Sequence, residues 1–367
     1  VSMTDAHAKP ITTRTSRRSI LKGLGAAAIG ISLVGKKSPA WAEEEPKLNF
    51  YNWDTYIGET TLADFQKASG IDVNMSLFAT NDELFAKLRA GNPGFDVIVP
   101  GSEFVERMIQ AALLEPLDHA KIPNIKNIAP EFINDAPYDP GRKYSMPYTW
   151  LVIGIGYRKS KVKETPDSWK YLFDSDEYKG RIAVMSDASE LFRNCFKYLG
   201  KSINDDSPEL IKQAEALLIK QKPNIKSFHE DNGQDLLLSG EVDVVMEYNG
   251  DIAQVMTEDD DLNFVVPKEG AMKQSDTLAI PKGAPHPENA LKFINFILDA
   301  NVGAEISKTI KYPSPNAAAV ALMPASYKDN PVIFPPADVM AKCEYPRYLG
   351  PDFTRLLDEA MTRLRAA

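Results

Sequence analysis

The 367-residue chain has only two cysteines and four histidines, too few for a disulfide framework or a histidine-rich metal centre. It also has no excess of basic residues, since 51 Asp and Glu outnumber 42 Lys and Arg and give a net charge of -9. We therefore expect no nucleic-acid partner. No apolar run reaches 18 residues, so the sequence predicts no membrane-spanning helix.

Motifs of the common hydrolases are missing too. The sequence contains neither a Gly-x-Ser-x-Gly nor a His-Glu-x-x-His segment, and His119, His229 and His286 have no evident partners. We predict that the protein is not an enzyme, with no catalytic residues, no metal and no cofactor. An exported hydrolase that uses an acid pair such as Asp187 and Glu190 is the alternative.

The first 42 residues have the three regions of an export signal in order. Arg17-Arg18 forms a twin-arginine motif, Gly23–Gly35 is mildly apolar, and Ala40-Trp41-Ala42 is a small-x-small cleavage pattern. We interpret residues 1–42 as a twin-arginine signal peptide and expect the remaining chain in the periplasm. Because the signal holds seven Lys and Arg and one acid, the remaining chain has a net charge of -15.

The two cysteines leave two interpretations open. An oxidising periplasm would permit a disulfide between Cys195 and Cys343. Cys195 equally suits a small buried position in a helix.

Strands and helices alternate along the remaining chain. The patterns predict strands at Lys47–Asn52, Ile71–Phe78, Phe95–Val99, Leu151–Tyr157, Arg181–Met185, Val242–Met246 and Leu278–Ile280. They predict helices at Thr60–Ser69, Asn81–Ala90, Glu103–Leu113, Asp187–Leu199, Pro208–Lys220 and Glu288–Leu298. This alternation predicts an α/β fold in which helices cover both faces of a sheet with parallel strands. The remaining chain of about 325 residues is long enough to favour two lobes with a ligand cleft between them.

Four short motifs occur in a fixed order at Tyr51–Tyr56 (YNWDTY), Asp96–Pro100 (DVIVP), Tyr144–Tyr148 (YSMPY) and Tyr312–Asn316 (YPSPN). In this order and spacing they resemble the periplasmic spermidine/putrescine-binding proteins, from about Leu48 to the C-terminus. The resemblance implies a two-lobed periplasmic binding protein fold, type II-like, in which the chain crosses hinges between the lobes. Lobe one would comprise residues 43–154 plus 275–320, and lobe two residues 155–274 plus 321–367.

The resemblance also implies a function. The protein would be a monomeric receptor that captures a small cationic amine of the putrescine and spermidine class for an inner-membrane ABC permease. A polyamine needs carboxylates to replace the water around its ammonium groups, and aromatic rings to pack on its methylenes. A receptor for another amine such as agmatine or γ-aminobutyrate is an alternative, and a ferric-ion receptor built on Tyr345 and Tyr348 is a third.

The matching positions imply a set of ligand contacts, namely Trp53, Tyr56, Ser102, Glu103, Asp187, Glu190, Tyr248, Asp251, Gln274 and Asp276. Asp276 matches the central carboxylate of the family, although the sequence also allows a solvated turn acid just before a strand. Asp187 and Glu190 are also compatible with a capping box, and Asp251 with a helix N-cap. Ser102 is predicted to cap the helix Glu103–Leu113. Trp53 and Tyr56, taken alone, slightly favour a core aromatic pair.

Several positions depart from the family pattern. Gln274 stands where spermidine-binding members have tryptophan, and Glu103 where a ligand-facing tyrosine is common. Gly101 stands where a small hydroxyl is expected, and Pro346 and Arg347 where a C-terminal glutamine would be. These departures favour a short diamine such as putrescine, or agmatine, over spermidine. If Lys273 or Arg347 faced the cleft, a zwitterion such as γ-aminobutyrate would become the rival.

Overall fold

The computed structural model describes residues 44–230 and 232–367, and the signal peptide predicted at residues 1–42 lies outside them. Glu44–Ala367 forms one compact unit. In the part of the chain that is described, no helix combines the length and the apolar character needed to cross a membrane.

These residues form nine strands and fifteen α-helices. The strands are β1 (Lys47–Asn52), β2 (Asp72–Leu77), β3 (Val97–Ile98), β4 (Ser145–Arg158), β5 (Ile182–Met185), β6 (Ile225–His229), β7 (Val244–Tyr248), β8 (Leu262–Val265) and β9 (Lys273–Ala279). The helices are α1 (Thr61–Ser69), α2 (Asn81–Arg89), α3 (Ser102–Gln110), α4 (Pro130–Asn134), α5 (Lys170–Phe173), α6 (Ala188–Tyr198), α7 (Pro208–Gln221), α8 (Gly233–Leu238), α9 (Asn249–Val255), α10 (Pro287–Ile297), α11 (Ala300–Ile310), α12 (Ala317–Leu322), α13 (Ala325–Lys328), α14 (Ala337–Met340) and α15 (Pro351–Ala366).

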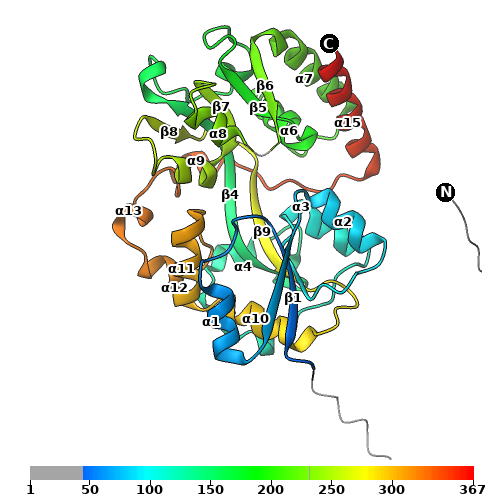
Figure 1. The fold of residues 1–367 in the computed structure, drawn as a ribbon. Coiled ribbons are helices and arrows are strands. Elements are labelled where there is room, and N and C mark those ends of the chain that lie inside the picture. Colours follow the sequence, from blue (N-terminus) through cyan, green and yellow to red (C-terminus); the bar gives the residue numbers. More distant parts are fainter. Residues whose placement is uncertain (1–43, 231) are drawn as a thin grey trace, which may run out of the picture. The chain divides into compact units, whose positions relative to one another are not determined.

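The strands make one mixed sheet in the order β2-β1-β3-β9-β4-β7-β5-β6, with β8 paired to β4. β1 is parallel to β2 and β3, and β5 is parallel to β6 and β7, which confirms the parallel strands predicted from the alternation. The centre is antiparallel, because β4 pairs with β9 along its first half and with β7 and β8 along its second. In Figure 1, β4 and β9 run from the elements around β1 to those around β5 and β7.

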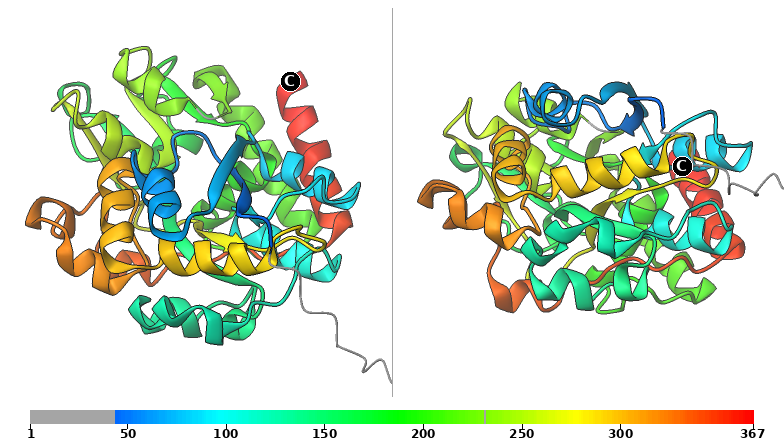
Figure 2. Two further views of the ribbon diagram at one scale, coloured as in Figure 1. Left: turned by 60° about the horizontal axis from the view of Figure 1, so that its bottom comes forward. Right: turned by 90° about the horizontal axis from the view of Figure 1, so that it is seen from below.

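Three apolar cores lie against this sheet. Leu48 and Phe50 of β1 pack with α1, α10 and α11, whereas Tyr51 packs in a second core with α2 and α3. Successive side chains of a strand point to opposite faces, which explains the division. A third core surrounds the second half of β4 and includes Trp169 and Phe192. Figure 2 shows α10 and α11 beside α1.

The sequence patterns located only part of each central strand. The strand predicted at Leu151–Tyr157 is the second half of β4, and the one predicted at Leu278–Ile280 covers only the end of β9. The missed part of β9 is polar, and it is held extended by its pairing with β4, which places Asp276 opposite Thr149. Asp276 therefore lies within a strand, and the prediction that it precedes one is wrong.

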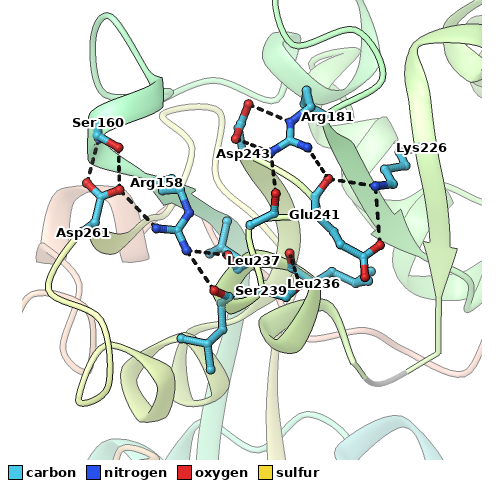
Figure 3. Close-up of polar contacts among 12 residues, drawn as sticks. Arg158, Ser160, Arg181, Lys226, Leu236, Leu237, Ser239, Glu241, Asp243 and Asp261 are labelled. Atoms are coloured by element: carbon cyan, nitrogen blue, oxygen red, sulfur yellow. Dashed lines mark hydrogen bonds and ion pairs between the residues drawn. The ribbon is translucent and has the colours of Figure 1, made fainter.

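Two arginines hold the connection between α8 and β7 (Figure 3). Arg158, at the end of β4, donates to the carbonyl oxygens of the last two residues of α8 and pairs with Asp259 and Asp261. Arg181 donates to two carbonyl oxygens of the loop that follows and pairs with Asp243 at 2.8 Å. The last carbonyls of a helix have no partner within the helix, so Arg158 supplies donors to two of them, and Arg181 does the same for the loop. They thereby fix the start of β7, whose last residue belongs to the candidate site.

Candidate ligand-binding site

Asp276 lies in the middle of β9 and is 7% exposed. Its Oδ2 accepts a hydrogen bond of 2.8 Å from the hydroxyl of Tyr56, which also lies 2.6 Å from Oγ1 of Thr149. Burial raises the pKa of Asp276 to about 6, although the hydrogen bonds from Tyr56 and Thr149 act to lower it. Within the described residues no Lys, Arg or His forms an ion pair with Asp276, so its ionised form would gain from an added cation.

Tyr56 is placed by the tight loop that follows β1. Thr55 has a φ of 49°, which is unusual for a β-branched residue and marks a sharp turn of the chain. The hydroxyl of Tyr148 then donates to the carbonyl oxygen of Tyr56 at 2.7 Å. Trp53, in the same loop, donates from Nε1 to the carbonyl oxygen of Val99 at 2.9 Å and is partly buried. Contact of Trp53 with a ligand stays a prediction.

Glu190 lies in the first turn of α6, where three elements meet. Its Oε1 accepts hydrogen bonds from the hydroxyl of Tyr248 at 2.5 Å and from Nε2 of Gln274 at 3.0 Å. Asp187 is the N-cap of the helix, because its side chain accepts a hydrogen bond from the backbone N–H of Glu190 at 2.9 Å. The structure thus brings three predicted residues together from α6, β7 and β9, and it gives Asp187 the capping role.

Asp251 lies near the start of α9, whose N-cap is Tyr248, so the reading of Asp251 as an N-cap is wrong. Its Oδ1 accepts a hydrogen bond of 2.7 Å from the hydroxyl of Tyr312. The Tyr312 ring packs on Gly250, where an added Cβ would lie 2.5 Å from ring atoms, so any larger residue would displace the ring. The ring also makes an edge-to-face contact with Tyr56, with the centroids 5.2 Å apart. Tyr312 therefore links Asp251 to the Asp276 side of the site.

Gly101 forms the N-cap of α3 and an isolated bridge with Asp276. A Cβ at Gly101 would lie 3.3 Å from Oε1 of Gln274 and 3.6 Å from Oδ1 of Asp276, so both side chains face this glycine. Ser102 is the first helical residue, and the prediction that it caps the helix is wrong. Its buried hydroxyl has no hydrogen-bond partner among the described residues.

Glu103 pairs with Arg193 of α6 at 3.0 Å, and its other carboxylate oxygen lies 3.4 Å from Oγ of Ser189. Beside this pair is a solvent-open hollow of about 500 Å³ between α3, α6 and α15. Four acids, two arginines and three aromatic rings are among the side chains that line it: Asp82, Glu103, Asp187 and Asp358, Arg107 and Arg193, and Phe104, Tyr348 and Phe353. The predicted residues Glu103 and Asp187 thus lie on the wall of the same hollow.

The two cations that could have favoured a zwitterion have other partners. Arg347 makes a two-fold contact with Glu106, at 2.7 Å from Nη2 and 3.0 Å from Nε. The ammonium of Lys273 lies over the ring of Tyr345, 4.6 Å from its centroid. Arg347 is thus already neutralised by a carboxylate of this chain.

The cysteines are both buried and free, so the disulfide considered from the sequence is not formed. Cys195 packs in the core around α6, as a small apolar residue would. Burial raises the pKa of its thiol, which keeps it protonated.

Two residues of this arrangement were missed in the sequence. Thr149 shares the Tyr56 hydroxyl with Asp276, and Tyr312 holds Asp251. Tyr312 opens one of the four motifs quoted above, and Thr149 directly follows another, so their positions could have suggested them. Burial raises the pKa of both Tyr56 and Tyr312, so each stays a hydrogen-bond donor at neutral pH.

The site combines acidic side chains with aromatic rings. Carboxylate oxygens of Asp276, Glu190 and Asp251 each accept a hydrogen bond from a tyrosine hydroxyl, of Tyr56, Tyr248 and Tyr312 in turn. Ammonium groups favour both features, because carboxylates replace their water and ring faces attract positive charge. In the described residues no three His, Cys, Asp or Glu side chains are grouped so as to hold a metal ion.

Residues 60–335 match the family described as bacterial extracellular solute-binding protein, and the chain belongs to this family. Its α/β fold is the two-lobed fold of the periplasmic binding proteins, as the sequence predicted. The lobe boundaries at residues 154, 274 and 320 stay predictions.

The relatives bind diamines and polyamines. Putrescine-binding periplasmic protein PotF of Escherichia coli K12 is 35% identical over 94% of this chain and 97% of PotF. A putrescine/cadaverine-binding protein of Pseudomonas aeruginosa is 32% identical over 89% of this chain and 95% of that protein. Among solved structures, the substrate-binding protein PotD of a Streptococcus pneumoniae spermidine/putrescine ABC transporter has a TM-score of 0.79 at 30% identity, covering 87% of this chain and 98% of that one.

Proposed function

We propose that the protein is a periplasmic receptor that binds a short diamine such as putrescine and delivers it to an ABC permease. The observation that carries the proposal is the pair of carboxylates, Asp276 and Glu190, each of which accepts a hydrogen bond from a tyrosine hydroxyl. Gln274 lies in the same strand as Asp276, and its side chain donates a hydrogen bond to Glu190. The relatives support the choice of ligand, because those named above bind putrescine, cadaverine or spermidine.

The proposed contacts divide into two groups. Seven residues would face the ligand: Trp53, Tyr56, Glu190, Tyr248, Asp251, Gln274 and Asp276. Three would support them: Ser102, Glu103 and Asp187. One ammonium would sit at Asp276 and the other at Glu190 or Asp251, with the methylenes along the tyrosine rings.

Two ammonium–carboxylate pairs are enough for a receptor of ordinary affinity. A micromolar dissociation constant corresponds to about 8 kcal/mol. Charge-assisted hydrogen bonds contribute about 1.5–3 kcal/mol each, and an ammonium donates more than one of them. Aromatic contacts with the methylenes add to this total, while desolvation and ordering reduce it.

Binding, without any reaction, is sufficient for this role. Contacts that exist only when the two lobes close on the ligand would shift the protein toward the closed form. The ligand should therefore be recovered unchanged after long incubation, which separates a receptor from the hydrolase alternative.

A thermal-shift panel of putrescine, cadaverine, spermidine, agmatine and γ-aminobutyrate tests the proposal. We expect putrescine to raise the melting temperature most, because a ligand that binds only the folded state stabilises it. Small-angle scattering should show a more compact particle with saturating putrescine. If γ-aminobutyrate alone stabilises the protein, the diamine proposal is wrong, although the ion pair between Arg347 and Glu106 argues against that outcome.

A further inference from the structure

Arg193 is a fully buried cation one turn after Glu190 in α6. Each of its five N–H donors has an acceptor at 2.9–3.0 Å: Oγ of Ser189, the carbonyl oxygens of Ile203 and Arg347, Oδ1 of Asn204 and Oε1 of Glu103. An arginine with all five donors satisfied is held in one orientation. Its guanidinium also faces the ring of Phe353, 5.0 Å from the centroid.

The five acceptors come from two different parts of the molecule. Four of them belong to α6, the loop after it, or the segment that leads into α15, all near the core that contains Phe192 and Phe353. The fifth, Glu103, belongs to α3, which packs through Val105 and Met108 in a different core. The ion pair of Arg193 and Glu103 therefore joins two cores.

The start of α3 also touches the other end of the candidate site. Gly101, two residues before Glu103, forms a backbone bridge with Asp276. Arg193 is three residues after Glu190 on α6. The ion pair thus connects the backbone beside one ligand carboxylate to the helix that carries the other.

The charge of Glu103 matters in this connection because it is the one charged acceptor of Arg193. The Glu103 side chain is 16% exposed and that of Arg193 is fully buried. Burial raises the pKa of Glu103, while the charge of Arg193 lowers it. Removing one partner of such a pair leaves the other charge buried without compensation, which is strongly unfavourable.

We propose that Arg193 and Glu103 are positioning residues, whose ion pair sets the separation of Asp276 and Glu190 and thereby the affinity for a diamine. Neither side chain touches the ligand in this arrangement. The inference rests on the proposed function, and it gives Glu103 a different role from the ligand contact predicted from the sequence.

The test compares two variants on one helix. Glu103→Gln removes the charge that faces Arg193 and keeps the volume of the side chain. Glu106→Gln is the control on the same helix, because Glu106 is also paired with an arginine, Arg347. Arg193 contacts only the backbone carbonyl of Arg347, so this change leaves every hydrogen bond of Arg193 in place. Calorimetry with putrescine gives the affinities, stopped-flow gives the rates, and melting without ligand reports on folding.

We expect Glu103→Gln to weaken putrescine binding about tenfold, mainly through faster dissociation, because association is limited by encounter. Glu106→Gln should change the affinity less than threefold. Without ligand, Glu103→Gln should melt below Glu106→Gln, because it leaves a fully buried guanidinium without its counter-charge, whereas Arg347 is 41% exposed. The affinities are compared at a temperature at which both variants are folded. A loss of affinity shared equally by both variants would overturn the inference, since it would reflect a general loosening of α3.

A double-mutant cycle separates positioning from direct contact. If Glu103 acts through Arg193, then Glu103→Gln has little further effect once Arg193→Lys has removed the guanidinium. If Arg193→Lys does not fold, Arg193→Gln replaces it, because it also removes the guanidinium and keeps a side-chain donor. A tenfold loss that persists in either background would show that Glu103 touches the ligand and would overturn the inference.

The outcomes also distinguish this inference from the proposed function. If putrescine binds the wild type but the variants give either of the contradicting results above, the inference is wrong and the proposed function stands. If no amine in the panel binds the wild type, the proposed function and the inference both fall.

Discussion

Asp276 and Glu190 are both proposed to hold an ammonium group, but the protein supports them differently. Asp276 is in mid-strand, where its backbone is fixed by pairing with β4 and its side chain by a hydroxyl from the loop after β1. Glu190 is in the first turn of a helix, and its carboxylate is held by side chains from two other elements, Tyr248 of β7 and Gln274 of β9.

The comparison shows two ways of preparing a carboxylate for a cation. The strand residue is buried and held by neighbours that the sheet already fixes, so little reorganisation is needed when a ligand arrives. The helix residue depends on how α6 is seated against β7 and β9. We therefore expect substitution at Asp276 to cost more affinity than the same change at Glu190.

The largest expected effect is that of Asp276→Asn. Removing the charge from a buried carboxylate that binds an ammonium costs about 2–5 kcal/mol, which is roughly three-hundredfold in the dissociation constant for putrescine at the middle of that range. Calorimetry on a variant that melts like the wild type measures it. An affinity within threefold of the wild type would remove Asp276 from the site.

Glu190→Gln should weaken putrescine binding less, by about tenfold to thirtyfold. The amide can still accept the hydrogen bond from Tyr248, so part of the local arrangement survives. The comparison is broken if this variant loses more affinity than Asp276→Asn under the same conditions.

Acidification should weaken binding with a midpoint near the pKa of Asp276, about 6 against its ordinary 3.8. At pH 5 only about a tenth of a group with such a pKa is ionised, so affinity should be about tenfold lower than at pH 7.5. The sign for stability is opposite, because the folded protein takes up this proton at a higher pH than the unfolded chain. Without ligand, the contribution of Asp276 to folding is fully present below about pH 4 and is lost as pH rises through 6.

The control for this pH effect is Asp276→Asn. Calorimetry and thermal melting from pH 5 to pH 8 should show the affinity loss in the wild type and not in the variant. Equal pH dependence in both would assign the titration to another group.

Tyr56→Phe should have a smaller effect at neutral pH, of about twofold. The lost hydroxyl is one of the groups that lower the pKa of Asp276, so its removal should raise that pKa further and leave less of the carboxylate ionised at pH 7. The measurement is the pH midpoint of putrescine affinity, which should move upward. A midpoint that moves downward would contradict the proposed role of the hydroxyl.

Arg158→Ala should leave putrescine affinity unchanged and lower the free energy of unfolding by about 2 kcal/mol. Arg158 pairs with Asp259 and Asp261 and donates to carbonyl oxygens at the end of α8. These partners do not include Asp276 or Glu190. Denaturant unfolding measures the loss of stability. If the variant is fully folded in the assay and its putrescine affinity still changes clearly, the contacts of Arg158 influence the binding site.

Much of the fold was predictable because its signals are local. Helices such as α1, which ends at Gly70 with a φ of 74°, and α6, which is capped by Asp187, have both an apolar stripe and an end signal in the sequence. β6, β8 and the polar half of β9 have no such signal. Their extended form depends on pairing with strands that are distant in the sequence.

The site shows the same limit. The family resemblance implied Tyr56, Glu190 and Asp276 as ligand contacts. The structure places a tyrosine hydroxyl against each of the two carboxylates, and Tyr56 supplies the one at Asp276. The partner of Glu103 could not be found in this way, because Arg193 is 90 residues away and lies in an ordinary amphipathic helix. The capping role given to Ser102 failed because the helix begins one residue earlier than predicted. Its N-cap is Gly101, where a Cβ would be tight against Asn81 and Gln274.

The sequence by itself determined the alternation of strands and helices, the acidic character of the chain and the family motifs, since each depends on residues that are near one another. Only the tertiary structure decided which acids meet hydroxyls, which meet arginines, and which titrate near neutral pH. These properties depend on burial and on partners brought from distant elements, such as Tyr56 to Asp276 across 220 residues. A carboxylate acquires its pKa and its partner from the space it occupies, which no local pattern specifies.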